Sequence, residues 1–190
     1  FTICEKSLER LAPNSSATIA VHCFGATANI ASLKKKDRLI IEDCCQSLGG
    51  PQGNEGIASI YSFYATKIIT GGQGGLIWSY DKELIERIVD YREFDCRESY
   101  KPRFNFQITD IQAAMISSQF DRLDEIKRKR RNIRKKYISS IQRLFENGWR
   151  IQEGFDSENI LPYRFILVAP NENERDQIKN RLYKKDIQCI

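Results

Sequence analysis

Residues 18–24 (TIAVHCF) and residues 38–42 (RLIIE) decide the fold of this chain. Both runs consist mainly of apolar and β-branched residues, which is typical of buried strands. The segment between them, residues 28–36, is long enough for a short helix. A strand, a crossover and a second strand indicate a βαβ unit, and therefore an α/β fold with parallel strands.

Two more strands are predicted at Ile57–Phe63 and Leu76–Tyr80, with glycine-rich loops before and between them. Asp81–Tyr91 carries its apolar residues on one face, which predicts a helix. Residues 94–106 show no such pattern and contain a proline, so we expect an irregular segment there.

A long helix is predicted next, with Thr109 or Asp110 as its cap. Its apolar residues follow a period of 3.6 and form one stripe: Leu123, Ile126, Ile133, Tyr137, Ile141 and Leu144. A further strand at Tyr163–Ala169 and a last helix at Glu174–Lys185 complete the expected elements.

The composition is that of an ordinary globular protein. Among 190 residues, 41% are hydrophobic and spread along the whole length, which excludes disorder for most of the chain. No apolar run approaches the ~20 residues of a membrane span, and the first residues do not resemble a signal peptide. Because the sequence starts at Phe1 in what resembles the middle of a domain, we expect a fragment.

The net charge of +5 comes from one place, residues 127–136, where eight of ten residues are Lys or Arg. Such a run can contact nucleic acid, but the apolar stripe continues through it. A solvated helix face is therefore the favoured interpretation, and no nucleic-acid partner is expected. Attraction for an anionic nucleotide-linked sugar is a weaker option.

The six cysteines show no CxxC spacing, so no zinc site is predicted, and they indicate reduced thiols in the cytoplasm. His22 is the only histidine, which excludes a histidine-rich metal centre. We expect His22 to be a packed strand residue at least as readily as a ligand.

Two polar residues follow predicted strands. Asp43 ends the run IIED, at the edge of an α/β sheet where ligands bind, although a capping role is the commoner use of such a residue. Lys67 follows SFYAT and precedes a glycine-rich turn, where an exposed loop lysine is the alternative to a nucleophile. Together they indicate pyridoxal phosphate (PLP), which needs a lysine amine and an acid at its ring nitrogen.

The same residues resemble a known family, the PLP-dependent nucleotide-sugar aminotransferases of the DegT/DnrJ/EryC1/StrS type. Residues 21–25 (VHCFG) are similar to its VHxxG, residues 42–46 (EDCCQ) to its EDAAQ, and residues 62–67 (SFYATK) to its SFxxxK. Residues 105–114 (NFQITDIQAA) resemble NxRxxExQAA, and residues 130–137 resemble RxxIAxxY. The order and spacing of these motifs make the combination specific.

The resemblance implies a role for each matched residue. Lys67 would form the Schiff base with PLP and move the proton, and Asp43 would pair with the ring nitrogen. Gln46 would lie near the phenolic oxygen of the ring, and Ser62 would bind the phosphate. Asn105 would reach the cofactor of a neighbouring subunit, which implies a homodimer with shared active sites. No metal is implied.

The resemblance also implies the activity. An amino acid, glutamate or glutamine, would supply the amino group for a keto group on a nucleotide-linked deoxysugar, in cell-surface polysaccharide biosynthesis. A catalytically inactive fragment or accessory subunit of the same fold is the alternative. The family's related dehydratases carry a histidine in place of Lys67, so the lysine argues against them.

The implied fold is that of type I PLP-dependent transferases. Residues 1–124 would be the remainder of the large PLP-binding domain, and residues 125–190 a long helix and part of a small α+β domain. The chain departs from the family pattern at Gln73 and Gln107, where an acidic residue and a basic or aromatic residue are usual. The expected N-terminal part, with a phosphate-binding turn and a stacking aromatic residue, is absent from the sequence.

Overall fold

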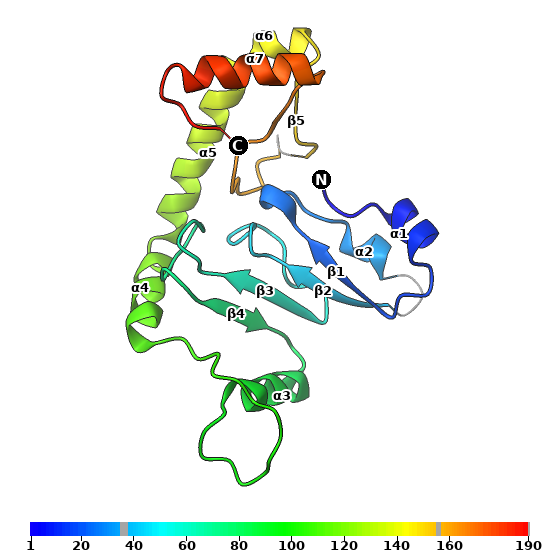
Figure 1. The fold of residues 1–190 in the computed structure, drawn as a ribbon, viewed down its shortest axis with the longest axis vertical. Coiled ribbons are helices and arrows are strands. Elements are labelled where there is room, and N and C mark those ends of the chain that lie inside the picture. The colour runs from blue at the N-terminus through cyan, green and yellow to red at the C-terminus, as the bar shows by residue number, and fades with distance from the viewer. Residues whose placement is uncertain (35–37, 155–156, 190) are drawn as a thin grey trace.

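The computed structural model describes residues 1–34, 38–154 and 157–189. Its centre is a four-stranded sheet in the order β1 (Ala17–Val21), β2 (Leu39–Asp43), β3 (Ala58–Ser62) and β4 (Gly75–Trp78) (Figure 1). β1, β2 and β3 are parallel, and β4 is antiparallel to β3. The predicted βαβ unit is therefore confirmed.

The first strand is shorter than predicted because a turn replaces its last residues. β1 ends at Val21, and Cys23–Gly25 form a 3-10 turn in which Phe24 has φ 59° and Gly25 has φ 100°. The amide of Tyr163, far along the chain, donates to the carbonyl oxygen of Phe24 over 3.1 Å. This tertiary contact holds the chain in the turn.

The two faces of the sheet differ in their cover. On one face Ala20 and Ile40 are buried against α2 (Ile30–Leu33), with the partly buried Leu8 of α1 (Glu5–Leu11) packed on the same core. On the other face Ile19 is 59% exposed and Ile77 44% exposed. Asp43 belongs to this open face, because it pairs in register with Val21 on β1 and Ile60 on β3.

The helix α2 covers only part of the predicted segment 28–36, whose residues 35 and 36 lie outside the described ranges. The side chain of Asn29 caps it by accepting from the amide of Ser32. Figure 1 shows α1 and α2 together beside the β1 edge of the sheet.

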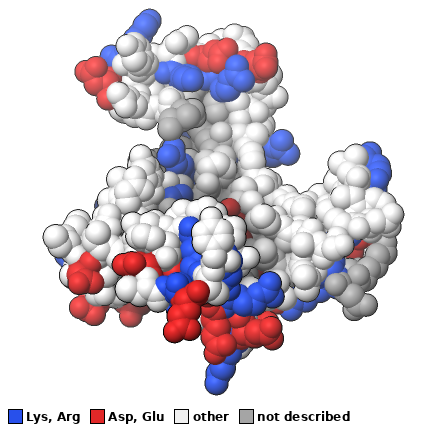
Figure 2. Space-filling view, turned by 60° about the horizontal axis from the view of Figure 1, so that its bottom comes forward, with Lys and Arg blue, Asp and Glu red and all other residues white. Residues whose placement is uncertain are grey.

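The helix α3 (Lys82–Arg92) follows β4 and is capped by Asp81. As predicted, the segment after it is irregular up to the next helix. Charged side chains of both signs lie side by side in this part of the molecule (Figure 2). Asp90 pairs there with Lys101 and Arg103, and Glu93 pairs with Arg97.

The long helix predicted from residue 109 onward is three helices, which corrects the prediction. They are α4 (Asp110–Phe120), α5 (Leu123–Ser140) and α6 (Gln142–Glu146). Thr109 does cap α4, in a capping box with Gln112. Gln119 ties α4 to the loop after β3 through both the amide and the carbonyl of Thr70, so the chain has to bend before α5 departs. Helix propensity does not register such a tertiary constraint.

The prediction of one continuous apolar stripe on the long helix is also only partly confirmed. Leu123 and Ile126 pack against a core formed by Phe63, Ile68, Ile69, Ile116 and Leu161. Ile133 and Tyr137, further along, are 53% and 51% exposed. Leu123 and Ile126 are therefore partly buried, whereas the middle of α5 stands away from the sheet (Figure 1).

The last part of the chain forms a small second layer at the far end of α5 (Figure 1). β5 (Arg150–Ile151) pairs with β6 (Leu167–Val168), and α7 (Glu172–Tyr183) follows. The strand expected at residues 163–169 is reduced to two residues, because the backbone of Tyr163 bonds to the turn after β1 instead. None of the described helices combines the length and apolarity that crossing a bilayer requires.

Gly25, in the turn after β1, lies too close to the backbone of Leu161 to carry a side chain. A Cβ atom there would lie 2.3 Å from the carbonyl oxygen of Leu161, at φ +100°. We expect Gly25→Ala to lower the free energy of unfolding by about 3 kcal/mol. Gly72→Ala, at φ +78° with open space around it, should cost only about 1 kcal/mol. Urea denaturation measures both, and equal losses would show that the close approach to Leu161 contributes nothing.

Candidate active site

Three polar side chains lie where the parallel strands end. His22 follows β1, Asp43 is the last residue of β2, and Ser62 is the last residue of β3. Because the strands are parallel, these residues share one edge of the sheet, the edge at which ligands bind in α/β folds. The prediction for Asp43 rested on this edge, whereas Ser62 was assigned through the resemblance to the SFxxxK motif; the structure has both at the ends of parallel strands.

Asp43 and Ser62 also share a face. Asp43 pairs with Ile60, and Ser62 lies two residues beyond Ile60 on the same strand, so both side chains point to the open side of the sheet. One carboxylate oxygen of Asp43 accepts a 2.9 Å hydrogen bond from the amide of Cys45, which orients the group. The hydroxyl of Ser62 accepts from the amide of Tyr64 at 3.3 Å.

Lys67 follows in a tight turn beyond β3. Its amide donates to the carbonyl of Tyr64 at 2.9 Å, and the buried Ile68 and Ile69 fix the next residues in the core. The ammonium nitrogen lies 5.1 Å from the centre of the Tyr163 ring. Lys67 is half-buried, and its side chain is therefore held beside an aromatic ring.

The pKa of the Cys45 thiol depends on both Asp43 and Lys67. Burial raises the pKa of Cys45 to about 12, a hydrogen bond with Asp43 adds to the rise, and the charge of Lys67 opposes it. Cys45 is accordingly a protonated, inert thiol.

Gln46 uses its side chain to join two strands. Its carbonyl oxygen accepts from the amide of Phe24 over 2.9 Å, so the residue stabilises the turn that ends β1. Its amide nitrogen is the remaining donor that this side chain offers to a ligand.

Asn105 stays apart from these residues. It is exposed, in the segment between α3 and α4, and the amide of its neighbour Phe104 donates to the carbonyl of Tyr91 in α3. Within the described ranges, no hydrogen bond or ion pair joins Asn105 to the edge that carries Asp43 and Lys67. The rings of Phe104 and Phe106 on either side of it stack at 5.0 Å and are 48% and 71% exposed.

His22 belongs to a buried network with Glu42, a residue that the sequence analysis did not single out. The imidazole Nδ1 accepts from the amide of Ala28, so Nε2 carries the proton and donates to Glu42 at 2.9 Å. The Glu42 carboxylate also accepts from three backbone amides, those of Gly53, Glu55 and Gly56. Glu42 thereby holds the glycine-rich loop against β2.

This network is structural rather than a metal centre. His22, Glu42 and Cys44 offer ligand atoms within 4.8 Å of one another, all buried. However, both imidazole nitrogens and both carboxylate oxygens are already hydrogen-bonded. Burial raises the pKa of the Cys44 thiol to about 11, which disfavours the thiolate that a metal requires.

The network makes stability depend on pH. Burial lowers the pKa of His22 below its ordinary value of 6.5, and the Glu42 bond only partly offsets this. Below pH 6.5 the unfolded chain binds a proton at His22, whereas the folded chain does not until the pH reaches the lower pKa of the buried imidazole. We therefore expect stability to be fully present above pH 6.5 and to fall as the pH drops through the folded pKa.

The chain has no other histidine, so this slope can be assigned. The variant His22→Gln should be less stable but should lose the pH dependence between 6.5 and 4.5, the ordinary pKa values of His22 and Glu42. Urea denaturation across that range measures it. An unchanged slope in the variant would assign the dependence to another group.

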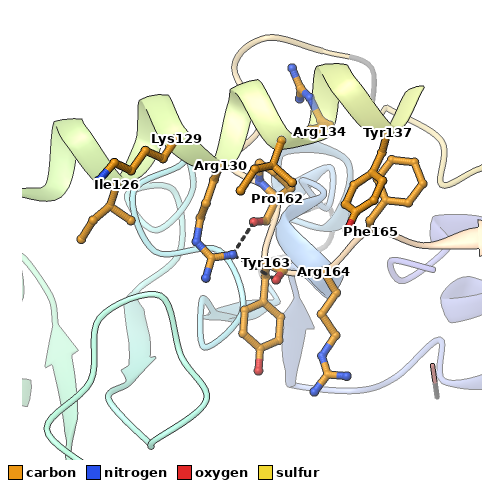
Figure 3. Close-up of a pocket in the computed structure, with 10 residues that line it drawn as sticks. Ile126, Lys129, Arg130, Arg134, Tyr137, Pro162, Tyr163, Arg164 and Phe165 are labelled. Atoms are coloured by element: carbon orange, nitrogen blue, oxygen red, sulfur yellow. Dashed lines mark hydrogen bonds between the residues drawn. The ribbon is translucent and has the colours of Figure 1, made fainter. Parts of the chain in front are cut away.

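Two arginines of the basic run on α5 do not lie on the solvated face that was predicted. Arg134 is 2% exposed and donates to the carbonyl oxygens of Ser157 and Ile160. Arg130 donates to the carbonyls of Pro162 and Tyr163, as Figure 3 shows. Lys129, by contrast, is exposed and pairs with Glu125. An arginine side chain can be buried when its guanidinium donates to carbonyl oxygens. The number of charged residues in a segment does not indicate which of them do so.

Tyr163 is the residue near Lys67 that sequence reasoning missed as a site residue. Its hydroxyl lies 3.2 Å from the hydroxyl of Thr66, the residue before Lys67. The two are 97 positions apart in sequence, and only the return of the chain past α5 brings them together. The sequence gives no local signal for such a contact.

A carboxylate, a hydroxyl and a lysine near one sheet edge suit a PLP-dependent transferase with an α/β fold, and the comparisons support this class. Residues 1–190 match the DegT/DnrJ/EryC1/StrS aminotransferase family. The chain belongs to this family, whose cofactor is PLP.

The relatives include sugar-modifying enzymes. The GDP-perosamine synthase of Escherichia coli O157:H7 is 24% identical over 95% of this chain and 52% of its own length. The dTDP-3-amino-3,4,6-trideoxy-alpha-D-glucose transaminase of Micromonospora megalomicea is 25% identical over 90% of this chain and 49% of its own length. The chain spans about half the length of the curated relatives it matches.

The fold is shared with solved structures as well. The E. coli GDP-4-keto-6-deoxy-D-mannose-3-dehydratase with bound hydrated PLP has a TM-score of 0.84 and 18% identity, covering 100% of this chain and 56% of that chain. At this identity the likeness concerns the fold alone. Aminotransferase structures share the same fold, so the choice of reaction depends on the site residues.

The residues present fit PLP. A carboxylate suits a protonated pyridine nitrogen, a hydroxyl at a strand end suits a phosphate, and a lysine amine suits an aldehyde. Asp43, Ser62 and Lys67 supply these groups near one sheet edge, and the hydrogen bond from the Cys45 amide orients the Asp43 carboxylate.

Proposed function

We propose that this chain is part of a PLP-dependent aminotransferase that transfers an amino group from an amino acid to a keto group of a nucleotide-linked deoxysugar. The observation that carries the proposal is the common edge and face of Asp43 and Ser62, with Lys67 in the turn beyond them. Family membership supports the same reaction class.

Each residue has a defined task in this proposal. When bound, PLP supplies an electrophilic carbonyl and an electron-accepting ring. Lys67 holds the cofactor through its Nζ atom and then acts as the base that moves a proton at the substrate carbon. Asp43 keeps the proton on the pyridine nitrogen through its carboxylate. Ser62 donates its hydroxyl proton to the phosphate, and Gln46 offers its amide nitrogen near the ring oxygen.

The substrates follow from the relatives' names. One relative is named for a GDP-linked sugar and another for a dTDP-linked amino sugar, which supports a nucleotide-linked keto sugar as the acceptor. Glutamate or glutamine is the proposed donor. We place the enzyme in the cytoplasm, in the biosynthesis of amino sugars for cell-surface polysaccharides, and the six free thiols suit a reducing compartment.

We propose a homodimer in which Asn105 reaches the neighbouring subunit's cofactor. Its exposure and its separation from Lys67 in the same chain support this arrangement. The exposed stacked pair Phe104 and Phe106 offers apolar area beside it. We also retain the division into a large-domain part, residues 1–124, and a small-domain part, residues 125–190.

Borohydride trapping tests the proposal. The protein at its natural length is incubated with PLP, reduced and digested, and the peptides are analysed by mass spectrometry. We expect one phosphopyridoxyl group, on the peptide that contains Lys67. Labelling scattered over many lysines, or none, would favour the alternative, an inactive or accessory chain of the same fold.

A further inference from the structure

Tyr163 and its neighbour Arg164 lie beside the candidate site, where Tyr163 approaches Lys67. Figure 3 shows both side chains extending away from α5. The guanidinium carbon of Arg164 lies 5.6 Å from the centre of the Tyr163 ring, and the ammonium of Lys67 lies 5.1 Å from the same centre. One aromatic ring therefore has two cations beside it.

Several basic residues of this chain pair with acids, as Arg97 does with Glu93 and Lys135 with Glu158. Within residues 1–34, 38–154 and 157–189, neither Lys67 nor Arg164 has a carboxylate within ion-pair distance. Two neighbouring positive charges without a counterion favour an anion from outside the chain.

The phenol of Tyr163 responds to the charge of these neighbours. Partial burial alone would raise the pKa of the Tyr163 phenol, but hydrogen bonding with Thr66 and Arg164 and the charge of Lys67 lower it. The hydroxyl is therefore a good hydrogen-bond donor, oriented by Thr66 at 3.2 Å.

The backbone that carries these side chains is fixed before any ligand arrives. The amide of Tyr163 donates to Phe24 at 3.1 Å, and its carbonyl accepts from Arg130 at 3.3 Å. Leu161, two residues earlier, is fully buried in the core. A preorganised binding group loses less conformational entropy on binding than a mobile one.

We propose that Arg164, together with the hydroxyl of Tyr163, binds an oxyanion of the substrate beside Lys67. A guanidinium forms two parallel hydrogen bonds with a carboxylate or a phosphate, so both anions have the required chemistry. The carboxylate would come from the amino donor, and the phosphate from the nucleotide. This inference rests on the proposed function, since it assigns the ligand as a substrate of that site.

Calorimetric titration of the holoenzyme at its natural length tests the inference with two probes, glutarate for the carboxylate and inorganic pyrophosphate for the phosphate. We expect Arg164→Met to weaken the binding of one probe about tenfold or more, since it removes a charged hydrogen-bond donor. The probe that is affected identifies the source of the anion. Arg181→Met, which removes an exposed arginine on α7, is the matched control and should bind both probes as the wild type does.

Two further variants separate binding from folding. Arg164→Lys keeps the charge but loses the planar fork, and should weaken the same probe to an intermediate degree. Tyr163→Phe should weaken it as well, with an unchanged melting temperature. Binding of both probes to Arg164→Met as tightly as to the wild type would overturn the inference.

The outcome is distinct from that of the trapping experiment. If Lys67 is labelled by PLP and Arg164→Met binds both probes normally, only the anion site is wrong. If Lys67 is not labelled, the proposed function itself fails, whatever the calorimetry shows.

Discussion

Replacing Lys67 by alanine is expected to lower the turnover of the natural-length enzyme by about a thousandfold or more. The variant removes both the amine that holds the cofactor and the base that moves the proton. Because Lys67 lies in a turn after β3 and is only half-buried, the loss of its side chain leaves the core intact. Conversion of a nucleotide-linked keto sugar to the amino sugar, with glutamate as donor, is the measurement.

Two controls show which property of Lys67 matters. Lys67→Arg keeps the positive charge, but its guanidinium stays protonated and cannot act as a nucleophile, so activity should remain low. Lys136→Ala removes an exposed lysine on α5 and should leave turnover within twofold of the wild type. Full activity of Lys67→Ala, in a protein with normal thermal stability, would refute the assignment.

Replacing Glu42 by alanine is expected to cost about 4 kcal/mol of unfolding free energy, the largest effect on stability that we predict. The carboxylate is 1% exposed and accepts hydrogen bonds from three backbone amides and from His22. Its removal leaves four donors without acceptors, and the two that are buried, on His22 and Gly53, carry the larger desolvation penalty.

The chemistry of the network gives a second variant. Burial alone would raise the pKa of Glu42, but the amides of Gly56, Gly53 and Glu55 outweigh it and lower the pKa, so the folded state favours the carboxylate. Glu42→Gln places an amide nitrogen against two of the donors and should cost about half as much as alanine. Glu86→Ala, on the exposed face of α3, should change stability by less than about 0.5 kcal/mol. A loss at Glu42 no larger than that at Glu86 would show that the loop does not depend on the carboxylate.

The candidate site was predictable where chemistry and local pattern coincide. Asp43 ends an apolar strand and Lys67 follows the next one before a glycine-rich turn, so strand order predicts a common edge for these two. Ser62 was assigned through the family resemblance. Glu42, the residue before Asp43, was passed over as a strand residue. Alternation along the strand turns it to the opposite face, where its partners come from a loop 11 to 14 residues away.

The amino-acid sequence by itself determined the parallel strands, the cap of α4 and the set of residues that suit PLP. These depend on period, propensity and residue type, which are local properties. Only the tertiary structure decided where the long helix bends, which arginines of α5 are buried, and that Tyr163 lies beside Lys67. Those features arise because a segment far along the chain returns past α5 to bond with the turn after β1. Contacts across such distances leave no periodic trace in the sequence.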